Sequence, residues 1–313
     1  MEHYVTLFDS LFLPQGLALH TSLDRHAGRY TLWVLCVDDA AFQVLQKLAL
    51  PNLRPLSVEH VLSDELRRVM PSRTRAEWCW TLTPFTPRFV FDADPTAQRV
   101  TYLDADVWML RSPQPIFGEF EASGKAVLIT EHAYAPEYDQ SRTSGRYCVQ
   151  FMTFVRDRGE SVRAWWAERC IEWCYARLED GKFGDQKYLD DWPLRFSEQV
   201  HVLQDRTLLQ GPWNATRFAP GDGVAYHFHG LRTLRGGHVL LTTLDYRLPQ
   251  TTVAQIYRPY RDDLSHASSL LKAVGVSPHP QLDAGLSSLW WQHNRAHLGA
   301  RLRSLFPPLF MQI

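Results

Sequence analysis

The stretch Val100–Leu110, VTYLDADVWML, passes from a short strand pattern through two acidic residues and back into apolar residues. Asp104 and Asp106 alternate with Ala, so their side chains point to the same side of an extended chain. They directly follow the strand predicted over Arg99–Leu103, and open α/β sheets bind ligands at the carboxyl ends of their strands. Two carboxylates placed there can hold Mn²⁺ or Mg²⁺ and leave positions free for phosphate oxygens.

A second Asp-Ala-Asp sequence occurs at Asp92 and Asp94. Pro95 and a turn-like stretch follow it, which favours a solvated loop. Pairs of Asp are common in loops, so the spacing alone is a weak signal. The position at the end of a strand is what favours Asp104 and Asp106 as the metal-binding pair.

The N-terminal part of the chain alternates patterns of strand and helix. It predicts a strand at His3–Phe8, a helix at Pro14–His26, a strand at Tyr30–Val37, a helix in DDAAFQVLQKL and a strand in LRPLSVEHV. This order indicates an α/β fold, a three-layer sandwich around a mainly parallel sheet.

Later patterns predict further strands at Arg99–Leu103, Lys125–Thr130, Tyr147–Arg156 and Val224–Gly230. A helix is expected over Gly159–Gly181, ending at its last glycine. Pro84 and Pro87 argue against one long regular helix over Arg75–Phe91.

Composition sets limits on the class of protein. The 313 residues are 45% apolar and carry a net charge of −1, which argues against binding nucleic acid through a basic face. We expect no membrane span and no secretory signal from the hydropathy pattern. The five cysteines show no disulfide-like spacing, which indicates reduced thiols in a cytoplasm. A change of character near Tyr257 predicts a main domain at 1–256 and a C-terminal helical extension at 257–313.

Two histidines alternate in the strand pattern YHFHG, so His227 and His229 share one face. Imidazole is a good third ligand for Mn²⁺ beside two carboxylates. An isolated histidine is more often a core or surface residue. Here, however, Gly230 and the basic Arg232 and Arg235 follow, and a close turn flanked by arginines suits a diphosphate.

A third cluster lies in GDQKYLDDW, residues 184–192. Asp185 follows a glycine and precedes helical spacing, so it can be read as the N-cap of a helix. In the alternative interpretation, Asp185 and Gln186 hydrogen-bond the hydroxyl groups of a sugar.

Taken in order, these motifs resemble those of nucleotide-sugar-dependent glycosyltransferases of the GT-A (Rossmann-like) fold. The similarity is greatest to family 8, which includes glycogenin and bacterial lipopolysaccharide galactosyl- and glucosyltransferases. It rests on HYVTLFDSLFLPQGLALHTSL, WCWTLTPF, VTYLDADVWML, GDQKYLDDW and YHFHG, and covers residues 3–235. The resemblance implies that 1–256 is a catalytic domain.

The resemblance also implies roles for single residues. Mn²⁺ or Mg²⁺ would be held by Asp104, Asp106 and His227, with Asp104 also close to the donor. His229 would be a neighbour of this metal site.

The same comparison assigns the donor pocket. Thr6, Leu7 and Asp9 would line the part that holds base and ribose. Asp185 and Gln186 would face the transferred sugar, as catalytic residues.

The chain departs from the family at two places. The family's Phe-Asn-Ser/Ala-Gly is replaced by Tyr-Cys-Val-Gln at 147–150, which brings Cys148 and Gln150 to the site; Gln150 is a further catalytic candidate beside the reacting face. The family's Lys-Pro-Trp is absent, and Arg232 would take over the phosphate contact of that Lys. Arg75 is the basic residue upstream of WCW and a second candidate for the phosphates.

The implied activity is a hexosyl transfer from a nucleotide-diphosphate sugar, expected to be a UDP-hexose, to a hydroxyl of a glycan or lipid-linked acceptor in bacterial surface polysaccharide assembly. Similar enzymes retain the anomeric configuration. Two other functions stay open. A sugar-phosphate nucleotidyltransferase would need a Gly-rich basic loop, which TLFDSLFLPQG lacks. A non-catalytic nucleotide-sugar or carbohydrate-binding protein would explain Cys148 and Gln150, but the complete set of metal ligands opposes it.

The C-terminal stretch Leu286–Phe310 is apolar, aromatic and basic. Such a segment can lie on an anionic membrane as a peripheral contact. The alternative is that its apolar face packs on the main domain, and Pro307 and Pro308 would end a helix there.

Overall fold

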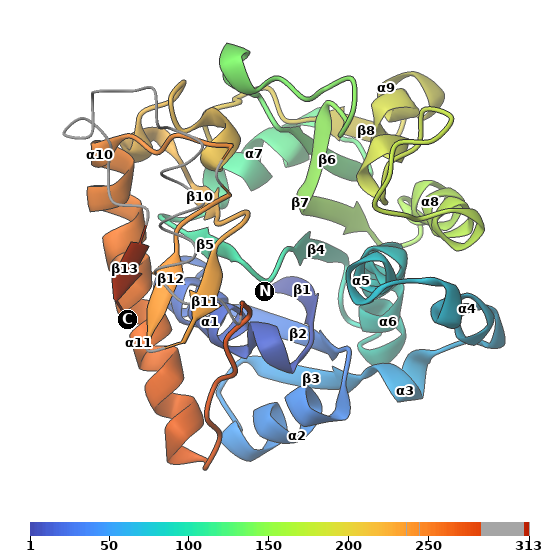
Figure 1. Cartoon of the computed structure of the whole chain (residues 1–313). Coiled ribbons are helices and arrows are strands. Elements are labelled where there is room, and N and C mark those ends of the chain that lie inside the picture. The colour runs from blue at the N-terminus through green and yellow to red at the C-terminus, as the bar shows by residue number, and fades with distance from the viewer. Residues whose placement is uncertain (236, 244, 283–309, 313) are drawn as a thin grey trace.

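The computed structural model in Figure 1 describes residues 1–235, 237–243, 245–282 and 310–312. The amphipathic segment expected at 286–310 lies outside the described residues, apart from its last position. Its two alternative roles therefore stay predictions, as does the boundary expected between 256 and 257.

A large sheet forms the centre of the molecule, with the strand order β3-β2-β1-β4-β7-β6-β8. Its strands are β1 (Glu2–Phe8), β2 (Tyr30–Cys36), β3 (Leu53–Ser57), β4 (Arg99–Leu103), β6 (Val127–Glu131), β7 (Tyr147–Val155) and β8 (Val200–Val202). Only β7 runs against its neighbours β4 and β6, while the other pairs in this sheet are parallel. The predicted α/β class with a mainly parallel sheet is confirmed.

Helices cover both faces of this sheet. They are α1 (Leu13–His26), α2 (Asp39–Leu48), α3 (Val58–Val61), α4 (Asp64–Val69), α5 (Arg75–Leu82), α6 (Thr86–Ala93), α7 (Gln114–Ser123), α8 (Glu160–Glu172), α9 (Trp192–Arg195), α10 (Gln250–Thr252) and α11 (Arg258–Ala273). Short 3₁₀ turns join them, among them η1 (Ser10–Phe12), η3 (Thr83–Phe85), η4 (Pro136–Tyr138), η5 (Gln186–Asp191) and η6 (Pro212–Asn214).

The three layers follow from the alternation of side chains along each strand. In β1, Tyr4 and Phe8 pack into the core beneath α1, α2 and α7. Val5 and Leu7 point the opposite way, into the core beneath α5, α6 and α8. Since both faces of the strand are covered, large apolar residues lie on each of them, as a covered parallel strand requires.

Two small sheets stand beside the large one. The first has the order β5-β10-β9 and consists of β5 (Val107–Met109), β10 (Ala225–His227) and β9 (Leu209–Gln210). The second contains β11 (Arg232–Leu234), β12 (His238–Leu240) and β13 (Phe310–Gln312). The antiparallel pairing of β10 with β5 sets His227 opposite Val107 and so brings a distant segment beside the end of β4.

The C-terminal helix α11 runs along one side of the molecule in Figure 1 and packs against α1. Asp263 of α11 fixes this contact, because it forms an ion pair with Arg25 of α1 and accepts a 2.7 Å hydrogen bond from the indole of Trp108. Among the described residues, no helix is both long and apolar enough to cross a membrane.

The helix predicted over Gly159–Gly181 was too long. Helix α8 ends at Glu172, and Trp173 is already extended. The residues that follow form a loop held by a 2.7 Å hydrogen bond from the backbone N–H of Ala176 to Glu77. Gly181 does adopt a positive φ of 73°, but in a turn at the tip of this loop instead of a helix end.

The segment 75–93 is helical in pieces. Pro84 and Pro87 each occupy the first turn of a new helix, η3 and α6, where a missing N–H costs nothing. Asp92, expected in a loop, lies in α6 and pairs with Arg88 one turn earlier. Asp94 caps the turn at Thr96, so neither acidic residue of this pair faces a cation site.

Gly16 of α1 is required by close packing. A Cβ at this position would lie 2.3 Å from a ring carbon of Phe8, which is itself 2% exposed. We expect Gly16→Ala to lower the free energy of unfolding by about 1–3 kcal/mol, as overpacked cores do. Urea denaturation followed by circular dichroism measures this.

Gly118 of α7 provides the matched control, because nothing lies within 4 Å of its Cβ position. Gly118→Ala should raise the free energy of unfolding by about 0.5–1 kcal/mol, the usual gain for alanine in a helix. Equal effects of the two substitutions would contradict the packing of Phe8 on α1.

Candidate functional site

A cavity of about 610 Å³ opens where β1 and β4 end and β7 begins. Its walls come from the ends of these strands, from α5, from the turn at η5 and from loops before and after β10. The order of the strands divides the cavity, because β4 stands between β1 on one side and β7 and β6 on the other. We call the two parts the β1 half and the β6 half.

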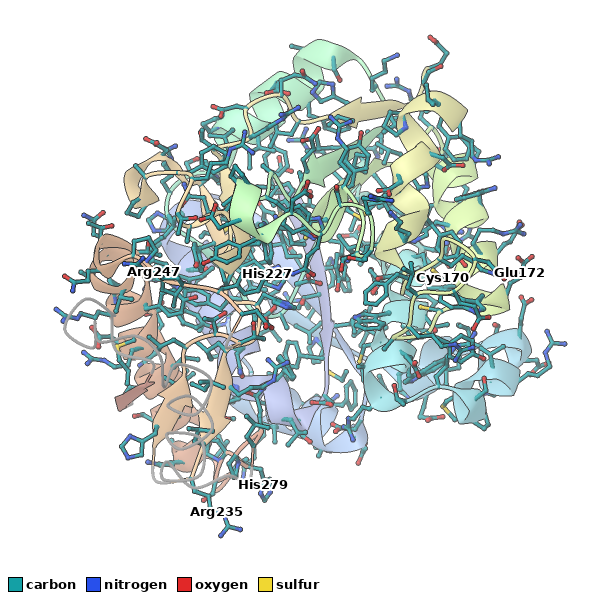
Figure 2. All side chains as sticks on the ribbon, turned by 45° about the horizontal axis from the view of Figure 1, so that its top comes forward. Cys170, Glu172, His227, Arg235, Arg247 and His279 are labelled. Atoms are coloured by element: carbon teal, nitrogen blue, oxygen red, sulfur yellow. The ribbon has the colours of Figure 1, made fainter. Side chains whose placement is uncertain are left out.

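Three potential metal ligands lie at the boundary between the halves. Oxygen or nitrogen atoms of Asp104, Asp106 and His227 all lie within 4.8 Å of one another. His227 Nε2 is 3.1 Å from an Asp106 oxygen and 3.7 Å from an Asp104 oxygen. Figure 2 shows His227 within the body of the molecule, surrounded by side chains of several elements.

The backbone holds this cluster in place. The N–H of Asp104 donates to the carbonyl of Gln150 in β7, and the N–H of Phe228 donates to the carbonyl of Asp106. Tyr102 donates a 2.8 Å hydrogen bond to the Asp104 carboxylate. Gly230, just after the cluster, has a φ of 78° and its Cβ position is only 2.8 Å from the backbone of Thr243, so a side chain there would displace the loop.

Burial and charge act against each other in the cluster. Burial alone would lower the pKa of His227, but the carboxylates of Asp106 and Asp104 raise it well above its usual value. Burial alone would raise the pKa of Asp106, yet His227 holds it at about 2. For Asp104, which is farther from His227, burial and the charge of Asp106 prevail and its pKa is raised.

The donor set fits a divalent cation. Carboxylate oxygens and one imidazole nitrogen are ligands that Mn²⁺ and Mg²⁺ accept, and two carboxylates balance a double positive charge. Without a cation, proximity to His227 compensates these buried charges only in part. The structure thus brings together the three ligands that the sequence analysis assigned to the metal.

Asp185 lies deep in the same cavity and is 5% exposed. It occupies the N-cap position of η5, as one interpretation of the sequence expected, but its side chain makes no capping hydrogen bond there. Burial and the neighbouring charge of Asp104 raise its pKa to about 8. Gln186 also lines the cavity, and its amide donates a 2.6 Å hydrogen bond to the carbonyl of Ser144.

The β1 half contains most of the residues predicted to bind the nucleotide. Leu7, Asp9 and Arg75 line it. Asp9 accepts hydrogen bonds from the N–H of Leu11 and from Arg75, which also pairs with Asp38. The positive charge of Arg75 is therefore shared between two carboxylates.

Two predicted residues do not line the cavity. Thr6 of β1 is completely buried, and Gln150 of β7 is 2% exposed. Both are enclosed by the sheet and its covering layer, while Cys148 is the residue of β7 that reaches the cavity. Thr6, expected in the pocket for base and ribose, and Gln150, expected beside the reacting face, therefore do not line the cavity.

The two arginines after the histidine motif, Arg232 and Arg235, lie in different places. Arg232 lines the β1 half, with its guanidinium 5.9 Å from the ring of Phe12, and its charge contributes to the low pKa of Asp106. Arg235 is exposed and points outward at the edge of the molecule in Figure 2.

The sequence analysis missed the aromatic side of the site. His132, Tyr134, Trp213 and Tyr246 line the β6 half. The indole of Trp213 donates a 2.8 Å hydrogen bond to the carbonyl of His132, and its ring meets that of His227 edge-on at 5.3 Å. His132 and Tyr134 share the loop after β6, whereas Trp213 lies in η6 and Tyr246 follows β12. Because these three segments meet only in the folded chain, no sequence pattern points to them.

The fold is similar to that of solved GT-A glycosyltransferases, so the expected resemblance is confirmed at the level of the fold. The glycosyltransferase GlyE of Streptococcus pneumoniae matches 89% of this chain with a TM-score of 0.50 and 14% identity; the chain spans 64% of GlyE. The galactosyltransferase LgtC, solved with donor and acceptor sugar analogues, matches 84% of this chain and 95% of its own with a TM-score of 0.49 and 11% identity.

Sequence relatives cover nearly the full length. The uncharacterized protein YfnF of Bacillus subtilis (strain 168) is 28% identical over 282 residues, 84% of this chain and 91% of its own. The uncharacterized protein YfnD of the same strain is 26% identical over 277 residues, 82% of this chain and 87% of its own. No protein-family model matches the sequence.

The raised pKa of Asp185 has a consequence for stability. The folded pKa of about 8 exceeds the value of about 3.9 for a free Asp, so the folded protein holds this proton more tightly than the unfolded chain does. The free energy of unfolding must therefore fall as the pH rises from about 4 to about 8. Asp185→Asn removes this loss, because the amide does not titrate.

We expect the variant to gain stability relative to the wild-type protein by roughly 2 kcal/mol or more across that window. Urea denaturation in EDTA at several pH values measures the difference. A constant difference between pH 4 and pH 8 would show that Asp185 is ordinarily solvated.

Removal of one of the three proposed metal ligands should strongly weaken cation binding. We expect Asp106→Asn to weaken Mn²⁺ binding by about 100-fold or more, because a buried carboxylate is lost from the cluster. Titration calorimetry measures the affinity. Asp92→Asn is the matched control from the other Asp-Ala-Asp sequence and should leave it unchanged; equal losses would mean that the cation site lies elsewhere.

Proposed function

We propose that this chain is a metal-dependent glycosyltransferase that moves a hexose from a nucleotide-diphosphate sugar, a UDP-hexose, to a hydroxyl group of a glycan or lipid-linked acceptor. The observation that carries the proposal is the cluster of Asp104, Asp106 and His227 at the end of β4, inside a cavity large enough for a nucleotide sugar. The GT-A fold supports it, since this position at a strand end is where such sheets bind ligands.

The cluster would hold Mn²⁺ or Mg²⁺, which supplies a Lewis acid that offsets the charge developing on the leaving diphosphate. The chain's own residues divide the remaining work. Leu7 and Asp9 form the wall for base and ribose in the β1 half. Arg232, which lines the same half and whose charge acts on Asp106, adds positive charge where the phosphates are placed.

Asp185 and Gln186 would face the transferred sugar. A buried carboxyl group in the wall of the cavity can bind a sugar hydroxyl in a fixed orientation, and orientation lowers the barrier to attack at the anomeric carbon. Gln186 is held by the carbonyl of Ser144, which leaves its amide oxygen free to accept from the substrate. We propose retention of anomeric configuration, in line with the family resemblance.

The direct test is donor hydrolysis. The full chain is incubated with Mn²⁺ and a panel of UDP-, GDP-, CDP- and dTDP-sugars, and release of nucleoside diphosphate is measured without an acceptor. We expect hydrolysis of one class of donor, lost in EDTA. Nucleoside monophosphate and sugar phosphate as products would instead indicate pyrophosphate chemistry, and binding without turnover would indicate a non-catalytic binding protein.

Asp185→Asn separates binding from chemistry. We expect this variant to keep its affinity for the nucleoside diphosphate within about twofold and to lose donor hydrolysis by about 100-fold or more, because the diphosphate does not reach Asp185 but the sugar does. Calorimetry and product release are measured on the same sample. A parallel loss of affinity and hydrolysis would contradict the placement of the sugar at Asp185.

A further inference from the structure

The β6 half of the cavity differs in chemistry from the β1 half. Three charged residues line the β1 half: Asp9, Arg75 and Arg232. The β6 half is lined by aromatic, amide and hydroxyl groups, namely Tyr134, Gln140, Ser144, Trp213 and Tyr246, together with His132 and Cys148. Within the described residues, no Asp, Glu, Lys or Arg side chain lines this half beyond Asp185.

The strand order decides which substrate reaches this half. The proposed nucleotide wall belongs to β1, and the metal cluster belongs to β4. The β6 half lies on the opposite side of the cluster, two strands or about 10 Å away at the usual strand spacing. A donor that extends from β1 to β4 therefore leaves the β6 half for a second molecule.

Aromatic surface is available there. The ring of Tyr134 is stacked on His132 at 4.6 Å and 13°, and it is only partly buried. Trp213 meets His132 edge-on at 5.1 Å and donates a hydrogen bond to its carbonyl, which holds His132 in place beneath Tyr134. The outer face of a fixed ring is a surface on which the C–H face of a sugar ring can pack.

Polar groups are held beside these rings by a strap, residues 136–146. At its C-terminal end the backbone N–H of Arg146 donates to Asp190. In its middle, Lys187 donates to the carbonyl of Ser141, and the amide of the neighbouring Gln140 donates a 3.1 Å hydrogen bond to the hydroxyl of Tyr246.

The strap leaves hydrogen-bonding capacity unused. Tyr246 accepts from Gln140, so its own O–H is free to donate. Gln140 retains its second amide hydrogen, and the hydroxyl of Ser144 donates to Gln140 and can still accept. These groups match the donors and acceptors of sugar hydroxyls.

We propose that the β6 half is the acceptor site and that it takes an uncharged sugar ring, packed on Tyr134 and hydrogen-bonded by Gln140, Ser144 and Tyr246. The proposal rests on the proposed transferase function and narrows its acceptor class. A sugar with a carboxylate would bring a charge into a wall that offers no cation, and burial of an unpaired charge is unfavourable.

The test compares matched sugars for direct binding, which does not require turnover. Methyl β-glucoside, methyl β-galactoside and methyl α-mannoside are each paired with the corresponding uronic acid glycoside, which differs only at C6. Saturation-transfer NMR is recorded on the full chain with Mg²⁺ and UDP. We expect signals from one or more neutral glycosides and at least about tenfold weaker binding of the paired uronate.

Protein variants locate the site. Tyr134→Ala should weaken binding of the neutral glycoside by about tenfold, which corresponds to about 1.4 kcal/mol, and Tyr134→Phe should restore it because the ring is retained. Phe218→Ala removes an equally half-buried ring that does not line the cavity and should change nothing. Thermal denaturation checks that each variant is folded.

The inference is overturned if uronates bind as tightly as their neutral partners, if Tyr134→Ala binds like the wild type, or if none of the neutral glycosides binds. These outcomes are separate from the transferase function, which donor hydrolysis tests without any acceptor. Where a donor has been found, the KM for the acceptor gives a second readout: Tyr134→Ala should raise it by about tenfold more than it changes kcat.

Discussion

The contact between Asp106 and His227 is the constraint on which the site depends. Asp106 follows the central strand β4, whereas His227 ends a short strand far along the chain. Their pairing requires β10 to lie antiparallel to β5, which begins one residue after Asp106. This small sheet therefore places an imidazole nitrogen beside two carboxylates at the end of the large sheet.

This arrangement has an energetic cost, because it buries charged side chains. Carboxylates and an imidazole share a space from which water is largely excluded, and the contact between Asp106 and His227 offsets part of the cost of their burial. Asp104 and Asp185 keep raised pKa values because both are buried and each lies near another carboxylate. A cation held by Asp104, Asp106 and His227 would offset the charge of these carboxylates, so the chemistry of the cluster is consistent with a divalent cation.

The sequence predicted the large sheet well, because strands buried on both faces have continuous apolar patterns and the β-α alternation leaves few topologies. It also selected Asp104 and Asp106 over Asp92 and Asp94, since a strand end is recognisable from local pattern. It placed Gly181 at a helix end, because a glycine in a turn and a glycine at a helix end look alike in sequence.

Other features could not be read from local pattern. Gln150 and Thr6 lie on the correct strands, but strand alternation alone does not tell which residues reach a cavity and which are covered by the next layer. Tyr134, Trp213 and Tyr246 come from loops that meet only in the folded chain. The aromatic lining of the β6 half therefore becomes visible only in the tertiary structure, whereas the residues of the metal cluster occur in recognisable sequence motifs.

The proposed cation site is tested most directly by pulsed electron paramagnetic resonance of Mn²⁺ bound to the full chain in the presence of UDP. We predict one population of Mn²⁺ with hyperfine coupling both to a histidine nitrogen and to phosphorus. The nitrogen coupling should disappear in His227→Gln. A nitrogen coupling that persists in this variant, or Mn²⁺ bound to protein nitrogen without any coupling to phosphorus, would contradict the claim that Asp104, Asp106 and His227 present a cation to a nucleoside diphosphate.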